Sequence, residues 1–510
     1  QNNNKVFIPS EENIQNRLQN NNKVFSFHFI RWKISSPSCI QLIIRTYQIL
    51  GFLPSDNSAT SNNNPGKGSW TQHLHHCLNW VHIFLYIFFA GSHLLNTMFR
   101  SIHYLPVMFE CILEDAVLTG IMTAAVILRM RIDRVKSTIQ LMEKTFSTAD
   151  IVLVAQSHWK AFRILATVAV FFMVITLGIL LERVTRMTED ELMIRRDLYQ
   201  TKYPGRRLLV DIWIPGLDET EYYWIYVTLF LVQVYATIVC LMTAYTGIVT
   251  LIPIITVHVE GQGKVLCKHI ERLGHPHKDL STGNTIFYTD IVKNQYNMLA
   301  SSKNSKLGET IEMSTIITKT FPEVKNFNDN QNTFTSEVNN SREDQLRKLR
   351  AYERDYFRQL VKFHQQLLLF EKQVTETISP LVLIMVLGNY MGVSLALYQL
   401  VVYSDQSKFR LFKFVSELSL ALFELYIYCF AAEILDDFHS RTRTSLYFSR
   451  WYACTRSTRR DIGMLLRRLR KPKHPNFYWG FIVINNPLFV GLLRLCYQVV
   501  NLMRLKGARE

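Results

Sequence analysis

The chain has 510 residues, of which 48% are hydrophobic and 12% aromatic, and its 57 Lys/Arg outnumber its 41 Asp/Glu to give a net charge of +16. Charged residues make up only 19% and cluster between long uncharged runs, which excludes a chain of ordinary soluble domains. The basic residues lie mainly beside apolar runs, which disfavours nucleic acid as a partner. The eight cysteines are scattered without a CxxC pair, so neither a disulfide framework nor a cysteine-ligated metal is predicted.

Residues 1–73 precede the first long apolar run. The string QNNNKVF occurs at 1–7 and again at 19–25, and two copies are too few for a repeat architecture, so we expect a tail without fixed structure. The Asn-rich start does not resemble a cleavable signal peptide. Residues 30–54 are moderately apolar and contain Arg45, which suits a helix lying in a membrane interface. We therefore interpret 1–73 as a cytoplasmic N-terminal tail with an interfacial helix.

Residues 74–278 are predicted to hold transmembrane helices 1–4, because their apolar runs are long enough to cross a bilayer. The predicted spans cover residues 73–95, 105–128, 164–181 and a longer run at 222–259. No turn residue interrupts 222–246, so the last run predicts one tilted helix that continues into the cytoplasm. The second span contains Glu110, Glu114 and Asp115, and charges at that depth face the interior of a bundle rather than lipid.

The next segment is polar. Residues 279–345 are rich in Asn, Ser, Thr, Lys and Asp and predict a flexible cytoplasmic insert. Residues 346–440 then predict a cytoplasmic helix, because apolar residues recur at helical spacing up to 377, followed by the fifth and sixth spans at 378–403 and 412–432. The sixth span contains Glu417 and Glu424.

Residues 441–510 combine a basic half with an apolar half. Residues 441–473 carry eleven Lys/Arg and a single acid, Asp461, whereas no charge occurs from 475 to 493. We expect a cytoplasmic anchor helix at 457–470 that leads into a seventh span at 476–503. Because basic residues stay on the cytoplasmic side, this order sends the C-terminus out of the cell.

The distribution of Lys/Arg predicts the direction of all seven spans. If successive spans cross the membrane in opposite directions, the segments on the cytoplasmic side carry 42 Lys/Arg and those on the outer side carry 14. Long segments count less in this rule, but 25 against 14 remain when residues 260–377 are left out. The sequence therefore predicts an all-α integral membrane protein with seven transmembrane helices, a cytoplasmic N-terminus and an extracellular C-terminus. A G-protein-coupled receptor has the opposite orientation.

No catalytic constellation is present in the sequence. Four histidines (His73, His75, His76 and His82) cluster near the first span, but no Glu or Cys stands at a spacing useful for metal binding, so a cluster at the membrane interface is favoured. His258 likewise has no spaced partner and is interpreted as structural. No phosphate-binding glycine loop, GxSxG or HExxH occurs. We expect no enzyme activity, no cofactor and no metal.

Several motifs carry a resemblance. Near the C-terminus stand Leu446-Tyr447, Trp451-Tyr452, an Arg/Leu run that ends at Lys471-Pro472, and Tyr497 before a short apolar end. Earlier in the chain occur Gly51-Phe52-Leu53-Pro54, Trp213-Ile214-Pro215 before an aromatic-led fourth span, His258-Val259-Glu260-Gly261-Gln262 and Ser379-Pro380. Together these resemble the insect odorant receptor family.

The resemblance implies a function. Members of the family are subunits of ligand-gated non-selective cation channels that bind small volatile molecules in a transmembrane pocket and open a pore lined by helix 7. Gln498 and Asn501 depart from the more apolar end of the family's co-receptor, Orco. We therefore expect an odour-tuned subunit that forms a hetero-tetramer with Orco in the plasma membrane of olfactory sensory neurons.

The resemblance also suggests site residues. The outer halves of helices two, three, four and six would supply a ligand pocket from Cys111, Phe172, Met173, Thr176, Tyr226, Phe230, Phe414 and Leu418. Alignment on Tyr497 would place Val500, Met503 and Arg504 at the pore. A cytoplasmic anchor would include His364, Leu465, Leu466 and Leu469.

Two other classes share part of this pattern. A gustatory receptor channel has the same fold and orientation, but its usual TYhhhhhQF ending is absent, since Tyr497 is followed by Gln, Val, Val and Asn. A G-protein-coupled receptor requires the reverse orientation, and a transporter requires internal repeats that the sequence lacks.

Overall fold

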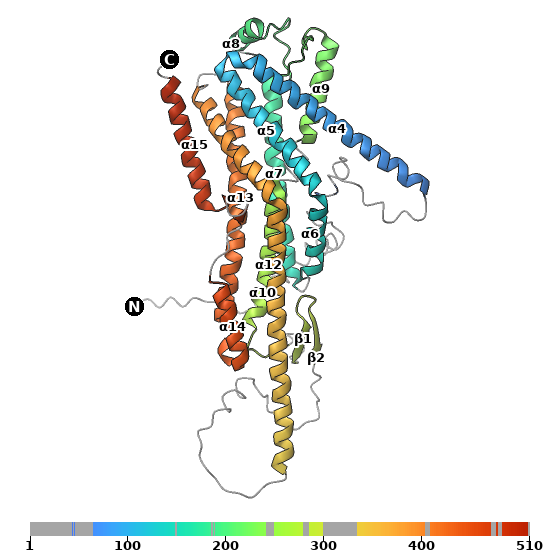
Figure 1. The fold of residues 1–510 in the computed structure, drawn as a ribbon, viewed down its shortest axis with the longest axis vertical. Coiled ribbons are helices and arrows are strands. Elements are labelled where there is room, and N and C mark those ends of the chain that lie inside the picture. Colours follow the sequence, from blue (N-terminus) through green and yellow to red (C-terminus); the bar gives the residue numbers. More distant parts are fainter. Residues whose placement is uncertain are drawn as a thin grey trace, which may run out of the picture.

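The computed structural model describes residues 43, 45, 65–147, 150–184, 187, 189–240, 249–278, 285–298, 334–402, 408–470, 476–477 and 482–507. It is a long bundle of helices with short strands, drawn with its long axis vertical (Figure 1). The first half contains α4 (Pro65–Phe99), α5 (Leu105–Met130), α6 (Ile132–Thr145), α7 (Ile151–Val184), α8 (Glu189–Met193), α9 (Tyr223–Cys240) and α10 (Thr250–Glu271). The second half contains α12 (Phe334–Val402), α13 (Lys408–Phe448), α14 (Arg456–Arg468) and α15 (Asn486–Gly507).

Among the described residues, five helices are long and apolar enough to span a membrane. Four lie within α5, α7, α12 and α13, and the fifth covers the second half of α4 and the short turn after it; all are close to predicted spans. A sixth apolar segment, Tyr223–Val239 in α9, is shorter. Whether α9 and α10 continue one another, as the uninterrupted run predicts, depends on residues 241–248, which lie outside the described part. The N-terminal repeat lies outside it too, and of the interfacial helix only Ile43 and Arg45 are described, both helical.

Helix α12 joins the predicted cytoplasmic helix and the predicted fifth span into one element. Its 69 residues span roughly 100 Å at 1.5 Å per residue, about three times the thickness of a bilayer core. Pro380 lies inside this helix rather than at its start and lacks the N–H that would bond the carbonyl of Glu376. Arg131 from the loop between α5 and α6 supplies the missing donor, since its Nη1 lies 2.7 Å from the Glu376 oxygen.

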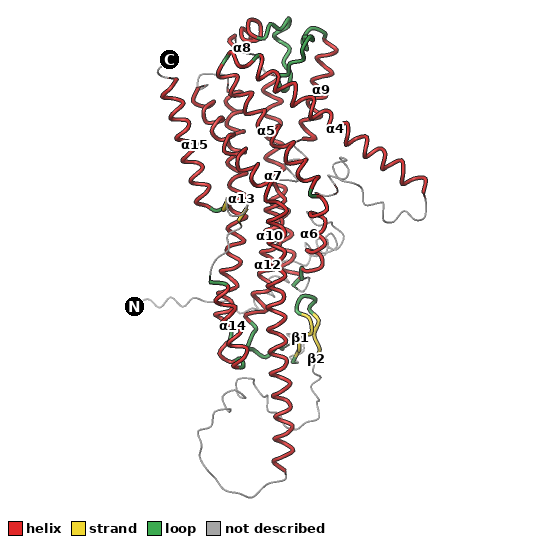
Figure 2. The backbone as a smooth tube through the Cα atoms, in the orientation of Figure 1, coloured by secondary structure: helices red, strands yellow, loops and turns green. Residues whose placement is uncertain are grey.

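The lower part of the bundle packs around α10, which is buried along most of its length. It packs mainly on α13 and α7. Figure 2 shows α10 running lengthwise within the bundle. Two glycines allow this approach: a methyl group on Gly261 would overlap Ser157 of α7, and one on Gly263 would overlap the Phe438 ring of α13. Between them, Gln262 fixes the end of α6, because its side-chain amide accepts from Ser147 N (2.7 Å) and donates to Ser147 O (3.1 Å).

Part of the predicted flexible insert is folded. Strands β1 (Ile286–Asp290) and β2 (Gln295–Met298) form an antiparallel hairpin that lies against α12 (Figure 1). Ile286, Tyr288 and Ile291 are buried, and Tyr288 N donates to the hydroxyl of Tyr352 on α12 (3.1 Å). The prediction of a flexible segment over 279–345 is therefore wrong for the hairpin and for residues 334–345, where α12 begins. Residues 299–333 lie outside the described part.

The start of the last helix also differs from the prediction. Residues 476–477 and 482–483 form the strands β3 (Asn476–Phe477) and β4 (Ile482–Val483), and α15 begins only at Asn486. The reason is local: Asn485 caps the helix, since its Oδ1 accepts from Leu488 N at 2.9 Å, and Pro487 suits a first turn where no N–H is needed. The anchor helix α14, in contrast, matches the predicted 457–470 within two residues.

Candidate functional site

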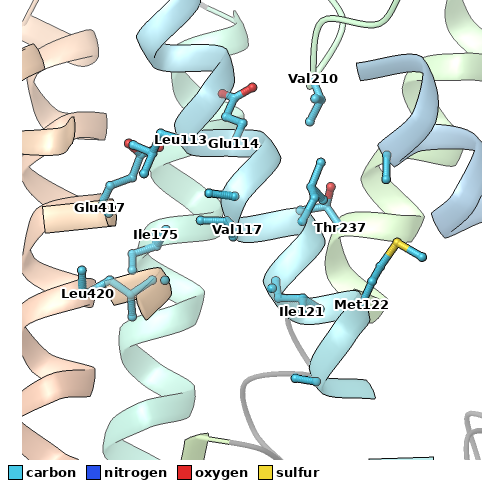
Figure 3. A pocket seen from close by; sticks show the side chains of 18 of the residues that line it. Leu113, Glu114, Val117, Ile121, Met122, Ile175, Val210, Thr237, Glu417 and Leu420 are labelled. Carbon is cyan, nitrogen blue, oxygen red and sulfur yellow. The ribbon is translucent and has the colours of Figure 1, made fainter. Parts of the chain in front are cut away.

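A cavity of about 250 Å³ lies in the upper part of the bundle, lined by residues of α4, α5, α7, α9, α12 and α13. Its walls are mainly aliphatic, and Figure 3 shows Leu113, Val117, Ile121, Ile175 and Leu420 directed towards it from three of these helices. Gly120 of α5 also lines it, and a methyl group added there would have no atom within 4 Å. A space of this size with apolar walls suits a small apolar molecule.

Charged side chains form one end of the cavity. Lys413 of α13 is almost fully buried, and its Nζ donates to Glu110 Oε1 (2.8 Å) and Glu114 Oε1 (2.9 Å) of α5. These two carboxylates are four residues apart and therefore share one face of α5. An unpaired lysine or carboxylate in an apolar interior costs several kcal/mol, so the three groups stabilise each other only while they remain together.

The network continues into α4 through His93. The fully buried imidazole contacts Glu114 Oε2 through Nε2 (3.0 Å) and Asp115 Oδ1 through Nδ1 (2.6 Å). Both nitrogens donate only in the protonated ring, so the geometry suits a positively charged His93. Thr97, one turn along α4, donates to Asp115 Oδ2 (2.6 Å). Three carboxylates of α5 therefore share two cations from the neighbouring helices.

The segment between α8 and α9 covers part of the cavity. Leu209 and Val210 line the space, and Figure 3 shows Val210 directed into it. Gln233 of α9 fixes this segment, because its Oε1 accepts from Leu209 N (2.9 Å) and its Nε2 donates to Val210 O (2.9 Å). Arg100, after α4, pairs with Glu219 at 2.6 Å further along the same segment. The cover is held by specific polar contacts at several points.

None of the eight residues predicted for the pocket lines this cavity, and the predicted pocket stays a prediction. They lie on helices that line the cavity but on other faces of them. The cavity uses Ile175 and Ile179 of α7, whereas Phe172 packs in the core and Met173 points outward. Cys111 is buried beside Ser101, and Phe414 is fully buried elsewhere. The remaining four also lie outside the lining: Thr176, Tyr226, Phe230 and Leu418. Helices that are apolar all round give no signal of which face meets a cavity.

The sequence did contain a signal for the polar lining. Glu114, Glu417 and Glu424 were recognisable as carboxylates within apolar spans, and such residues usually face a bundle interior or a cavity. All three line the space, together with Lys413 and Asn389. Figure 3 shows Glu114 and Glu417 on α5 and α13, at the cavity wall.

The residues predicted for the pore lie on α15. Val500 is only 7% exposed within the single chain, on the same face as Cys496, whose thiol lies 3.8 Å from the Tyr390 carbonyl of α12. Within the single chain its side chain therefore packs against other residues of the same chain, and the place of Val500 at the pore stays a prediction. Met503 and Arg504 lie within α15, but their side chains are outside the described part.

The residues predicted for the anchor come together around α14. Leu469 is buried with residues of α10, α12 and α13, and Leu465 and Leu466 pack against the same cluster. His364 of α12 is buried, with its ring 6.2 Å from the ring of Phe438. His258 is also buried, next to His158. Within the described residues, no group of three or more His, Cys, Asp or Glu is arranged to hold a metal ion.

The fold and the cavity define a helical membrane protein with a buried space for a small ligand. The family model described as 7tm Odorant receptor matches residues 122–497, about three-quarters of the chain. The chain therefore belongs to the odorant receptor family, which is a family of membrane receptors and not of enzymes.

Individual relatives are distant. Odorant receptor 82a of Drosophila melanogaster is 25% identical over 145 residues, which cover 28% of this chain and 37% of that protein. The solved structure of the insect olfactory receptor OR5 from Machilis hrabei has a TM-score of 0.60 at 12% identity and covers 94% of this chain and 98% of that one. The structure of the same receptor in complex with eugenol has a TM-score of 0.59 at 11% identity, with coverages of 94% and 99%. At these identities the likeness shows the fold alone.

Proposed function

We propose that this protein is the odour-binding subunit of a ligand-gated non-selective cation channel, and that the cavity between α4, α5, α7, α9, α12 and α13 receives the odorant. The observation that carries the proposal is an apolar cavity of about 250 Å³, covered by a segment that Gln233 holds in place. Family membership and the solved eugenol complex of a protein with this fold support it. A ligand opens such a channel only if it binds the open state better than the closed state.

The channel part of the proposal concerns α15. Its exposed face includes Tyr497, Gln498, Asn501 and Leu502, and an unpartnered face of this kind suits contact with other subunits or with a pore. We place the pore lining on this face, in a hetero-tetramer with the co-receptor Orco in the plasma membrane of olfactory neurons. In recordings, Leu502→Ser is expected to change basal current or ion selectivity, whereas Val500→Ser is expected to reduce expression.

The experiment that tests the function is an odour-evoked current from the full chain co-expressed with the co-receptor. Gly120→Leu fills the cavity and should raise the odorant concentration for half-maximal current at least tenfold, because the ligand loses its space. Gly91→Leu is the matched control, because Gly91 on α4 is exposed and outside the lining. Equal responses of the two variants at equal surface levels would refute the ligand site.

The proposed orientation places the N-terminus inside the cell and the segment between α8 and α9 outside it. Lys202→Asn with Pro204→Ser creates a glycosylation sequon at a surface position of that segment. Lys202 is mainly exposed, so its replacement removes only a surface ion pair to Glu221. We expect a glycan at this site and none at the natural sequon that begins at Asn339. The reverse result, detected by a gel shift, would invert the proposed orientation.

A further inference from the structure

The cavity wall contains a buried carboxylate with an unused oxygen. Glu424 of α13 lines the space and is only 4% exposed, and its Oε1 has no hydrogen-bond partner among the described residues. Asn389 of α12 is 6% exposed and lies beside the Glu424 carboxyl group as its neighbouring hydrogen-bond donor. Buried polar atoms are nearly always bonded in folded proteins, so a buried carboxyl oxygen that faces a cavity and has no hydrogen-bond partner among the described residues indicates a place where a ligand group binds.

The charges around the cavity indicate the sign of that group. Glu114, Glu417 and Glu424 line the space, and Lys413 is the one basic side chain among the described lining residues. Lys413 is already bonded to Glu110 and Glu114, and His93 to Glu114 and Asp115, so both nearby cations are engaged by α5. Among the described residues no cation acts on the Glu424 carboxyl group, so an added positive charge is stabilised there and an added negative charge is repelled.

The rest of the lining restricts what carries this charge. Around Glu424, the wall is formed by Leu420 and Ala421 of α13 and by Ile384 and Met385 of α12. A ligand that fills this space needs an apolar body together with one cationic head. An ammonium group offers N–H donors and no acceptor, which complements Glu424 Oε1. The Asn389 amide can present its oxygen to the same group after a half-turn of its side chain.

We propose that this receptor is tuned to small volatile amines, with the Glu424 carboxylate pairing with the ligand's ammonium group and Asn389 supporting it. This inference rests on the proposed odorant-binding function and specifies the chemical class of the ligand at that site. The amine enters with its proton or takes it from the Glu424 carboxyl group, and both routes end in the same ion pair. The ion pair compensates the two charged groups for the hydration that they lose when the ligand enters the apolar space.

The test uses ligands that differ only in the head group. Phenethylamine, phenethyl alcohol and propylbenzene have nearly the same shape, as do isoamylamine and isoamyl alcohol. Currents are recorded from the full chain co-expressed with the co-receptor. For each amine, the half-maximal concentration of the wild type is expected to be at least tenfold below that of its neutral counterparts. The reason is the added binding energy of a buried ion pair.

Glu424→Gln keeps the shape of the side chain and removes its charge. It should raise the half-maximal concentration of the amines roughly 100-fold while changing that of the neutral ligands less than about threefold. Glu424→Asp keeps the carboxylate and should retain part of the amine preference. This variant separates the loss of charge from a loss of folding. Asp437→Asn is the matched control, because Asp437 lies on the same helix with its side chain 63% exposed. All responses are normalised to the receptor present at the cell surface.

The outcomes separate the two proposals. Neutral ligands that act as well as amines on the wild type, or equal losses for all ligands in Glu424→Gln, would overturn the amine inference. In that event, a response to neutral odorants that Gly120→Leu weakens would still support the odorant-binding function. Both proposals would be refuted if no odorant from a broad panel evoked a current while the wild type and Gly120→Leu were present at the cell surface.

Discussion

The two ends of the bundle are held together by different forces. The cavity half consists of α4, α5, α7, α9 and the parts of α12 and α13 around the cavity, and buried charges connect its helices around an open space. The α10 half consists of α10, the adjoining part of α7, α14, the β1–β2 hairpin and the parts of α12 and α13 that pack on them, and a continuous cluster of buried apolar side chains joins α10, α12, α13 and α14. Open space suits ligand entry, whereas close packing suits a rigid base that transmits a change of shape.

Loss of Lys413 is expected to have the largest effect on stability. Lys413→Met leaves Glu110 and Glu114 buried without their shared cation, which should destabilise the protein by about 3–5 kcal/mol. Thermal unfolding of the purified receptor and its surface level in cells measure the loss. Adding Glu110→Gln and Glu114→Gln should recover part of it, because the uncompensated charges disappear.

Lys268→Met is the control for this prediction. Lys268 of α10 pairs with Asp150 at 2.9 Å, but its side chain is 54% exposed, so the change should cost less than about 1 kcal/mol. If Lys413→Met were as mild as Lys268→Met, buried charges would not be what holds the cavity half together.

A methyl group in the α10 half is expected to have the next largest effect. Gly263→Ala forces the buried Phe438 ring out of its place and should cost about 1–3 kcal/mol as overpacking. Gly463→Ala on α14 is the same chemical change at a position where the methyl group meets open space. The control should be neutral or stabilising by up to about 1 kcal/mol, since alanine favours a helix. Equal melting temperatures for the two variants would contradict close packing at α10.

Acid is expected to have the smallest effect near neutral pH, and it should act on the α10 half. Burial lowers the pKa of both His269 and His277 to about 4. His277 uses both nitrogens in its neutral form, with Tyr352 Oη at 2.6 Å from Nδ1 and the Arg272 carbonyl at 3.3 Å from Nε2. Arg272 opposes a further positive charge beside both rings.

The direction in which pH changes the stability of the fold follows from the lowered pKa values of the two histidines. The unfolded chain binds protons below about pH 6.5 and the folded chain only near pH 4, so stability is full above pH 6.5 and falls between these values. At pH 6 the loss is about 1 kcal/mol per histidine. Unfolding followed by fluorescence at several pH values should show this slope, and His269→Gln with His277→Gln should flatten it. The exposed His103→Gln serves as the control, and a slope unchanged by the double variant would be contrary to the prediction.

The contrast between the halves explains which predictions from sequence succeeded. The basic helix α14 and the apolar segments in α4, α5, α7, α12 and α13 were predictable, because composition and periodicity act over a single stretch of chain. The hairpin at 286–298 was not, since its few apolar residues gain stability only by packing on α12. The folded part of the insert means that its deletion should remove buried contacts with Tyr352.

What the sequence by itself determined is the set of apolar segments, the bias of basic residues between them and the presence of carboxylates inside the spans. The tertiary structure alone decided which faces meet. Ile175 and Met173 are equally apolar neighbours on α7, yet one lines the cavity and the other points outward. Val500 faces its own chain because α15 packs on α12 through that side. The physical reason is that the hydrophobic effect drives burial without direction, so an all-apolar helix takes its orientation from its partners.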